Sequence, residues 1–336
     1  MHPSPPPSVL PAVETPAPGA VALMAADMKE VDAVIRDRLG SDVAMINQVA
    51  HYIISAGGKR IRPMLVLLFS NALGFTGHER FDLAATVEFI HTATLLHDDV
   101  VDESALRRGR QTANALFGNA ASVLVGDFVY SRAFQMMVSV NRLRVLEVLA
   151  DATNVIAEGE VLQLMNMHDP DLSVDDYLRV IRFKTAKLFE ASARIGAVLA
   201  DAGAEIEESC AAYGRSLGTA FQLVDDLLDY EGATEQLGKN VGDDLREGKP
   251  TLPLLLAMER GTTDERELIR HAIEHGEMAR LPEIVEIVRR TGAITATRDA
   301  ARAEADKAAQ ALGILPPSAY REALLELCFR SVERSS

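Results

Sequence analysis

Two copies of one acidic pattern, each at the end of an apolar segment with helical spacing, constrain this chain more than any other feature. Residues 98–102 read Asp-Asp-Val-Val-Asp, and residues 225–229 read Asp-Asp-Leu-Leu-Asp. Residues four apart share one face of a helix, so the first and last aspartate of each cluster line up and repel each other. A hard cation that prefers oxygen ligands would remove this repulsion. The clusters therefore predict two acidic walls across a cavity, with magnesium and a phosphorylated substrate between them.

A chance occurrence on a solvated surface is the alternative interpretation of these clusters. Asp and Glu occupy 49 of 336 positions, so one such pattern needs no special explanation. Both copies, however, follow apolar segments, residues 90–97 and 220–224. Carboxylates beside a buried face are rarely left without partners. Two copies in such surroundings favour the binding site over the surface.

The composition favours an all-α protein that does not bind nucleic acid. Hydrophobic residues make up 48% of the chain, aromatic residues only 5%, and there is no Trp. The length is enough for a large core. A net charge of -15 argues against a nucleic-acid partner, because phosphate backbones are bound by basic surfaces. It does not argue against a small phosphorylated ligand, which responds to local charge.

The cysteines and the apolar segments indicate a location inside the cell. Cys210 and Cys328 are the two cysteines, and neither belongs to a Cys-x-x-Cys pair, so we expect neither a zinc site nor a disulfide framework. The N-terminus lacks the basic start and apolar run of a secretory signal. No apolar stretch reaches the ~18–20 residues that span a bilayer. We therefore expect a cytoplasmic protein without a transmembrane segment, although its product can be membrane-bound.

Hydrophobic periodicity predicts one all-α domain over residues 21–336 behind a disordered Pro/Ala-rich tail, residues 1–20. We expect a ring of antiparallel helices around a central deep pocket. Polar loops are expected at residues 103–118 and 232–250, and shorter helices between 252 and 330. The main predicted helices span residues 21–38, 44–55, 61–73, 81–98, 120–138, 143–167, 174–199 and 206–230.

Basic residues accompany both acidic clusters. Residues 57–63 read Gly-Gly-Lys-Arg-Ile-Arg-Pro, which places Lys59 and Arg62 on one face at a helix start, where free N–H groups favour anions. A solvated basic turn is the alternative for this segment. Further cations follow the two clusters, and arginine forks match phosphate oxygens in pairs. These cations are Arg107, Arg108, Lys184, Lys239 and Lys249. The set fits two diphosphates, one bridged by metal to the carboxylates and the other held directly by cations.

Two further polar side chains lie on the helices that carry the clusters. His91 is two turns before Asp98 on the same face and could donate to a diphosphate, or could be a hydrogen-bonded core histidine. Gln222 is one turn before Asp226 and could orient a substrate, or only satisfy a neighbour.

Five motifs of this chain together resemble those of the trans-type polyprenyl diphosphate synthases, and they occur in that family's order. They are residues 57–63, residues 95–103 with Arg107-Arg108-Gly109, residues 184–186 (Lys-Thr-Ala), residues 222–229 and residues 248–251 (Gly-Lys-Pro-Thr). The resemblance covers residues 25–336. Within the family, residues 114–137 and the first cluster's helix look most like the bacterial octaprenyl diphosphate synthases of quinone biosynthesis.

The resemblance implies an isoprenoid-synthase fold and a magnesium-dependent, head-to-tail condensation of isopentenyl diphosphate with an allylic diphosphate such as farnesyl diphosphate. The product would be about octaprenyl (C40) diphosphate, for a quinone side chain. It also implies a homodimer and about three Mg²⁺ ions, with Mn²⁺ as a possible substitute.

The same resemblance assigns roles to individual residues. The metal ligands would come from Asp98, Asp99, Asp102, Asp225, Asp226 and Asp229. The allylic diphosphate would be held by Arg107, Lys184, Lys239 and Lys249. Isopentenyl diphosphate would be held by Lys59, Arg62, His91 and Arg108. Thr185 and Gln222 would border the allylic carbons.

Product length should follow the depth of an apolar tunnel along the first cluster's helix. Ala93 and Thr94 are small where short-chain members of the family carry bulky aromatics, and Ile90 adds no aromatic wall further back. One helical turn of ~5.4 Å is about one isoprene unit, so eight units need roughly 40 Å. Phe134 is a candidate for the tunnel floor, with ordinary core packing as its alternative.

Rival readings differ in the motifs that they require. A medium- or short-chain (geranylgeranyl) synthase would share every motif above. A non-catalytic helical subunit should have lost aspartates or cations, and none is lost. A terpene cyclase usually lacks the second Asp-Asp-x-x-Asp cluster. A di-iron bundle requires Glu-x-x-His pairs on two helices, and this chain has only one such pair, Glu88 with His91.

Overall fold

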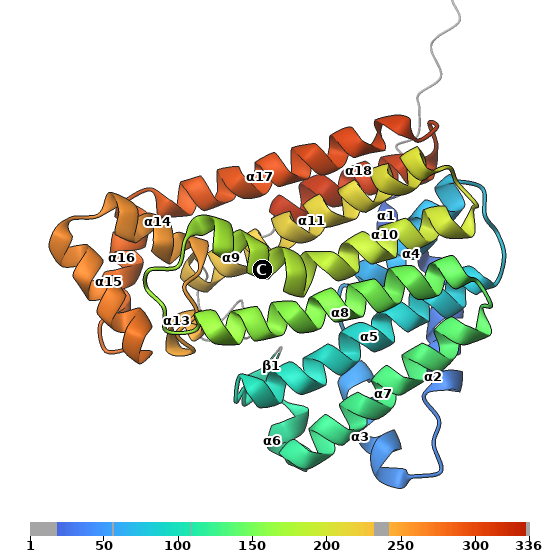
Figure 1. Cartoon of the computed structure of the whole chain (residues 1–336), viewed down its shortest axis with the longest axis horizontal. Helices are drawn as coiled ribbons and strands as arrows, with labels where there is room; N and C mark the ends of the chain where they lie inside the picture. Colours follow the sequence, from blue (N-terminus) through green and yellow to red (C-terminus); the bar gives the residue numbers. More distant parts are fainter. Residues whose placement is uncertain (1–18, 56, 108, 232–241, 334–336) are drawn as a thin grey trace, which may run out of the picture.

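The computed structural model describes residues 19–55, 57–107, 109–231 and 242–333, and these are almost entirely helical (Figure 1). The N-terminal half contains α1 (Ala20–Leu23), α2 (Ala25–Arg38), α3 (Ala44–Ser55), α4 (Ile61–Ala72), α5 (Glu79–Val101), α6 (Ala113–Phe117), α7 (Asn119–Ser139) and α8 (Leu143–Asn166). The C-terminal half contains α9 (Val174–Ile181), the π-helix η1 (Arg182–Ala186), α10 (Lys187–Leu199), α11 (Ala204–Glu231), α13 (Asp243–Arg246), α14 (Leu252–Arg260), α15 (Thr263–His275), α16 (Leu281–Arg290), α17 (Ala293–Ala311), the 3₁₀-helix η2 (Leu312–Ile314) and α18 (Ala319–Val332). The all-α prediction is confirmed.

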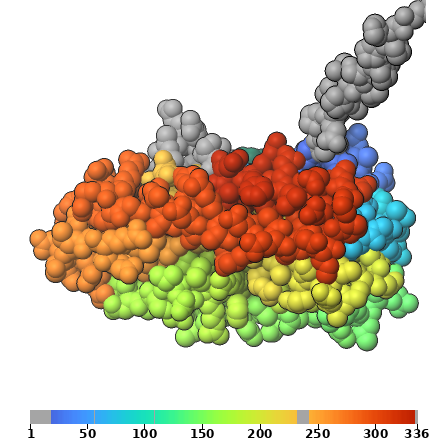
Figure 2. Space-filling model, turned by 90° about the horizontal axis from the view of Figure 1, so that it is seen from above, coloured from blue at the N-terminus to red at the C-terminus, as the bar shows by residue number. Residues whose placement is uncertain are grey.

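The long helices lie side by side and share one apolar core (Figure 1). Helix α10 packs against α4, α8 and α11, while α5 packs against α4 and α7. Helices α17 and α18 cover one face of the molecule, and α14–α16 extend from one end of it (Figure 2). This arrangement brings α5 and α11, which carry the two acidic clusters, around the same interior.

Two glycines let neighbouring helices approach the π-helix closely. A Cβ atom on Gly159 of α8 would lie 2.6 Å from the backbone nitrogen of Lys184, and one on Gly218 of α11 would lie 2.6 Å from the Cα atom of Ala186. Real Cβ atoms do not tolerate such distances, so these positions require glycine. The two glycines hold α8 and α11 against the segment that carries Lys184 and Thr185.

The structure corrects three details of the predicted elements. Residues 174–199 are not one regular α-helix, because η1 interrupts them; π-turns use the same residue types as α-helices, so periodicity does not reveal them. The predicted loop 103–118 contains α6 and an antiparallel hairpin, β1 (Leu106–Arg107) with β2 (Arg110–Gln111), in which Arg107 pairs with Arg110. The predicted helix 21–38 is broken at Met24, where the backbone leaves helical geometry.

Some predictions fall outside the described residues. The Pro/Ala-rich tail lies almost wholly in residues 1–18, and much of the predicted loop 232–250 lies in residues 232–241. The described end of that loop contains α13. Among the helices that the structure describes, none combines the length and the apolar character needed to cross a bilayer.

Candidate active site

Both acidic clusters line one cavity of about 550 Å³ between α5, α11 and η1. Asp98 comes from α5, Asp225 and Asp229 come from α11, and Thr185 comes from η1. A second cavity of about 170 Å³ shares Asp98 and Asp225 and adds Asp102. The predicted arrangement of two carboxylate walls around a common space is therefore the observed one.

Asp99 does not take part in either wall. Its side chain is fully buried, and its Oδ1 atom accepts a hydrogen bond of 2.8 Å from Nε of Arg107. Its backbone oxygen accepts a second from Asn114 at 3.0 Å. Asp99 is one position along from Asp98, about 100° further around the helix, so it points to the hairpin instead of the cavity. The prediction that Asp99 is a metal ligand is not supported by this placement.

Asp226 lines both cavities but is only 5% exposed and is already bonded on both oxygens. The Tyr177 hydroxyl donates to Oδ2 at 2.5 Å, and the Gln222 amide donates to Oδ1 at 2.7 Å. Burial, with repulsion from Asp244, raises the pKa of Asp226 from 3.8 to about 8. Asp226 therefore differs from the cavity-facing Asp98, Asp225 and Asp229 in having its carboxylate directed into a protein network.

Two lysines reach the aspartates of the first cluster from other elements. Nζ of Lys184 lies 2.6 Å from Glu160 of α8 and 3.8 Å from Asp98. Nζ of Lys249 lies 3.1 Å from Asp102 and 2.6 Å from Glu247. Each lysine thus bridges one cluster aspartate and one glutamate. An ammonium group in this position can exchange a carboxylate partner for the phosphate oxygens of a ligand.

The charge balance around the first cluster favours cation binding. Burial raises the pKa of Asp98, with Asp102 adding to the rise and Lys184 opposing it. Burial, followed by repulsion from Asp98, raises the pKa of Glu160 from 4.5 to about 7 despite its contact with Lys184. Burial alone would lower the pKa of Lys249, yet Asp102 and the neighbouring acids raise it. The charged forms of Asp98 and Glu160 are therefore disfavoured by burial, and a bound cation would favour them.

The predicted second diphosphate site opens on the same large cavity. Lys59 and Arg62, at the start of α4, and His91 of α5 all line it. The guanidinium group of Arg62 lies 4.4 Å from the centre of the Phe189 ring. Arg60 adopts a left-handed backbone (φ 48°), which is unusual for a residue with a side chain, and its guanidinium pairs with Glu88 at 3.2 Å.

The remaining predicted site residues are placed as follows. Thr185, Gln222, Arg107 and Lys184 line the large cavity. Arg108 and Lys239 lie outside the described residues. Of the chain-length candidates, Thr94 lines the large cavity, whereas Ala93 and Ile90 are fully buried and line neither cavity.

Phe134 is not placed where the predicted tunnel floor requires it. It is 36% exposed on α7, and the centres of its ring and of the Tyr130 ring lie 5.4 Å apart. Its neighbours Met136 and Met137 are buried instead. The physical reason is the helical repeat, which turns Phe134 to the surface while the two methionines face the core.

Sequence reasoning missed several side chains that line the cavities: Glu88, Glu160, Tyr177, Asp243 and Asp244. The backbone N–H of Asp244 donates to Asp229 at 3.1 Å, so α13 contributes directly to the second wall. For Asp243 and Asp244, the signal available in the sequence was that two adjacent aspartates occur shortly before Lys249. Glu160 could have been noticed as an acid beside the helix-contact residue Gly159.

Comparisons with known proteins agree with this geometry. The sequence profile of the polyprenyl synthetase family matches residues 43–288. The octaprenyl diphosphate synthase of Escherichia coli (strain K12) is 58% identical over 93% of this chain and 97% of its own length. An all-trans-nonaprenyl-diphosphate synthase (geranyl-diphosphate specific) of Rhodobacter capsulatus is 44% identical, with 94% and 97% covered. The crystal structure of a polyprenyl synthase from Caulobacter crescentus CB15, complexed with calcium and isoprenyl diphosphate, is 50% identical, with 94% of this chain and 97% of that chain covered and a TM-score of 0.91.

Proposed function

This chain belongs to the polyprenyl synthetase family, and from that premise we propose that it condenses isopentenyl diphosphate head-to-tail with farnesyl diphosphate to make octaprenyl diphosphate. It is a prenyltransferase of the long-chain, all-trans type with the isoprenoid-synthase fold. The observation that carries the proposal is the single cavity lined by both acidic walls, by Lys184, and by Lys59 and Arg62. The use of the product for a quinone side chain is part of the same proposal.

The carboxylates fit magnesium that binds together with a diphosphate. Asp98, Asp102, Asp225 and Asp229 supply the hard oxygen donors that Mg²⁺ prefers. In the described part of the chain, however, no three acidic, His or Cys side chains converge to hold a metal alone. Mg²⁺ commonly takes one or two carboxylates and completes its shell with water and substrate phosphates. Family resemblance suggests about three such ions, with Mn²⁺ as a substitute.

The chain's own residues divide the chemistry between two ends of the cavity. Magnesium, when bound, would neutralise the charge that develops on the leaving diphosphate. Lys184, Lys249 and Arg107 would hold that diphosphate and add fixed positive charge as its bond to the allylic carbon breaks. The double bond of isopentenyl diphosphate would supply the electron pair of the new carbon–carbon bond, so no protein nucleophile takes part. The proton then lost would pass to the departing diphosphate.

Isopentenyl diphosphate would bind at the start of α4. Lys59 and Arg62 offer cations on one face there, and His91 lies across from them on α5. The left-handed Arg60 and its ion pair with Glu88 help to define the shape of this segment. Arg108 would join this site. This arrangement would present the double bond of isopentenyl diphosphate to the allylic carbon beside Thr185 and Gln222.

We also propose that the protein acts as a homodimer through α6, α7 and α8. Exposed apolar side chains occur on α6, on the first turns of α7 and on the last turns of α8. They are Leu116, Val123, Leu124, Val161, Leu164 and Met165. Contiguous exposed apolar surface commonly marks a protein interface. Sedimentation of Leu124→Lys should show a shift from dimer to monomer, and a wild-type monomer would contradict the proposal.

We further propose a cytoplasmic location. Both substrates are charged and water-soluble, whereas the apolar chain of the product would enter the membrane after release. Fractionation of cells that express the full chain should recover it without detergent, and recovery only with membranes would contradict this location.

One assay tests the proposed activity. The purified full chain is incubated with Mg²⁺, labelled isopentenyl diphosphate and farnesyl diphosphate, and the dephosphorylated products are sized by chromatography. We expect an octaprenol, loss of product in EDTA and recovery with added Mg²⁺. A four-unit product would favour the short-chain alternative, and absence of any product would contradict the proposal.

A further inference from the structure

Tyr177 of α9 reaches the second acidic cluster although it is 49 residues away in sequence. It is 4% exposed, it lines the smaller cavity, and its hydroxyl donates to Oδ2 of Asp226 at 2.5 Å. None of the roles described above gives α9 a part in the reaction. The Tyr177 hydroxyl is buried and donates its hydrogen bond to a carboxylate of the second cluster, so its role in the site requires an explanation.

The contact with Asp226 is the end of a chain of hydrogen bonds. Oδ1 of Asp226 accepts from Nε2 of Gln222 at 2.7 Å, and Oε1 of Gln222 accepts from the Thr185 hydroxyl at 2.9 Å. The chain thus links α9, α11 and η1. It ends at Thr185, whose side chain lines both cavities.

The direction of every bond in this chain follows from the chemistry of its members. The amide nitrogen of Gln222 can only donate, so Oδ1 of Asp226 accepts a hydrogen bond from it, while Oδ2 accepts one from the Tyr177 hydroxyl. The amide oxygen of Gln222 must then face Thr185, and the Thr185 hydroxyl must donate its hydrogen to it. The remaining lone pairs of the Thr185 oxygen are left for the cavity.

We propose that Tyr177 is a positioning residue that, through Asp226 and Gln222, holds the Thr185 oxygen with its lone pairs toward the allylic carbons of the substrate. This inference rests on the proposed function, since positive charge develops on those carbons when the diphosphate leaves. A preoriented oxygen stabilises such charge without reorganisation. Without the Tyr177 hydroxyl, the buried Asp226 oxygen loses its donor, the Gln222 amide can turn, and Thr185 can present its hydrogen to the cation instead.

The chain offers a matched control for this role. Tyr213 of α11 is also fully buried, and its hydroxyl donates to the backbone oxygen of Leu324 at 2.8 Å. Tyr213→Phe therefore removes an equivalent atom and an equivalent buried hydrogen bond from a different part of the fold. Any effect common to both variants reflects stability, and any effect confined to Tyr177→Phe reflects the site.

The test compares the full-length wild type, Tyr177→Phe and Tyr213→Phe in the condensation assay. We expect Tyr177→Phe to lower kcat about ten- to hundredfold, the range for loss of a hydrogen bond to a charged group. The KM for isopentenyl diphosphate should stay the same, and so should the affinity for Mg²⁺ with an uncleavable thio-analogue of farnesyl diphosphate, measured by calorimetry. Tyr213→Phe should keep the wild-type kcat. A kcat of Tyr177→Phe within twofold of that of Tyr213→Phe would overturn the inference.

A double-mutant cycle with Thr185→Val tests the route of the effect. Thr185→Val removes the oxygen itself, so adding Tyr177→Phe should lower kcat little further. If the double variant instead loses kcat by the product of the two single-variant factors, Tyr177 acts independently of Thr185, and the inference is overturned. Should Tyr177→Phe not fold, Thr185→Ser, which keeps the hydroxyl, must retain far more activity than Thr185→Val, and equal activities would overturn it. An inactive wild type would count against the proposed function instead.

Discussion

At the scale of single residues, the two acidic clusters are not simple repeats. In the first cluster Asp98 and Asp102 face the cavities, whereas Asp99 holds Arg107. In the second cluster Asp226 joins the hydrogen-bonded chain from Tyr177. The second position of each cluster therefore supports the arrangement of the cavity, and the outer positions line the cavities with their carboxylates.

This division predicts different phenotypes for two adjacent aspartates. Asp98→Asn should reduce turnover by several orders of magnitude and raise the Mg²⁺ concentration needed for half-maximal rate. Asp99→Asn should leave that concentration near its wild-type value but raise the KM for the allylic substrate about tenfold, because Arg107 loses a charged partner. Magnesium titrations of the initial rate measure both effects. An equal shift in Mg²⁺ requirement for both variants would contradict the division.

Glu160 predicts a pH dependence of stability in the ligand-free protein. Its pKa is raised from 4.5 to about 7, so the folded state binds a proton more tightly than the unfolded state. Protonation of Glu160 therefore stabilises the fold at pH values below the pKa of Glu160 in the unfolded chain. This stabilisation is lost as the pH rises through 7. Glu160→Gln should therefore lose less unfolding free energy than the wild type between about pH 5 and pH 8.

Chemical denaturation across this pH range, without metal, measures the difference. Glu158→Gln is the matched control, because Glu158 is on the same helix but exposed. The control should follow the wild-type curve. Parallel curves for the wild type and Glu160→Gln would show that Glu160 titrates in the folded protein much as it does in the unfolded chain.

At the scale of elements, α5 serves two purposes through different faces. Thr94 faces the large cavity one turn before Asp98, while Ala93 is fully buried. Both positions lie on the helix along which we predicted the product tunnel. Only Thr94 opens directly on the described cavities, so the two positions allow the tunnel hypothesis to be tested with and without disturbance of the core.

Thr94→Phe and Ala93→Phe should both shorten the product toward three or four isoprene units while activity persists. The aromatic ring would block growth of the chain beyond the first cluster. Ala93→Phe should also destabilise the fold by about 1–3 kcal/mol, since it overpacks a filled position. Chromatography of the dephosphorylated products and thermal unfolding measure the two effects. Unchanged product length in both variants would refute a tunnel along α5.

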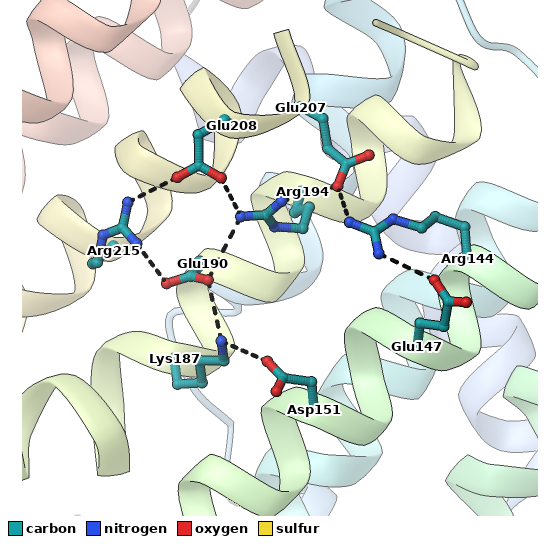
Figure 3. A network of polar contacts seen from close by, with 9 residues as sticks. All are labelled: Arg144, Glu147, Asp151, Lys187, Glu190, Arg194, Glu207, Glu208 and Arg215. Carbon is teal, nitrogen blue, oxygen red and sulfur yellow. Dashed lines mark hydrogen bonds and ion pairs between the residues drawn. The ribbon is translucent and has the colours of Figure 1, made fainter. Parts of the chain in front are cut away.

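At the scale of the whole molecule, a network of charged side chains joins the helices on the side of α8, α10 and α11 (Figure 3). Glu190 of α10 is 8% exposed and contacts Lys187 at 3.2 Å, Arg215 at 3.4 Å and Arg194 at 3.8 Å. Arg194 and Lys187 continue the network to α11 and α8. The same three helices carry or flank Glu160, Lys184 and the second cluster.

Loss of the central carboxylate should weaken the whole assembly. Glu190→Gln leaves three cations without a shared anion, and we expect a loss of about 1–3 kcal/mol in unfolding free energy. Glu147→Gln, at the exposed edge of the same network, should cost less than about 1 kcal/mol. Urea denaturation of both variants measures this. Equal losses of unfolding free energy in Glu190→Gln and Glu147→Gln would show that Glu190 is no more important to the network than its exposed edge.

The amino-acid sequence by itself determined the helices, the two acidic clusters and the cations that accompany them. These features are local, because helical periodicity and four-residue spacing place side chains on faces without knowledge of the fold. The tertiary structure alone decided which aspartates face the cavity, that Lys184 and Lys249 bridge cluster aspartates to Glu160 and Glu247, and that Tyr177 reaches Asp226. Such contacts join residues up to 147 positions apart. They depend on how closely the helices pack and on the π-turn at η1. The hydrophobic periodicity of a single segment predicts neither of these features.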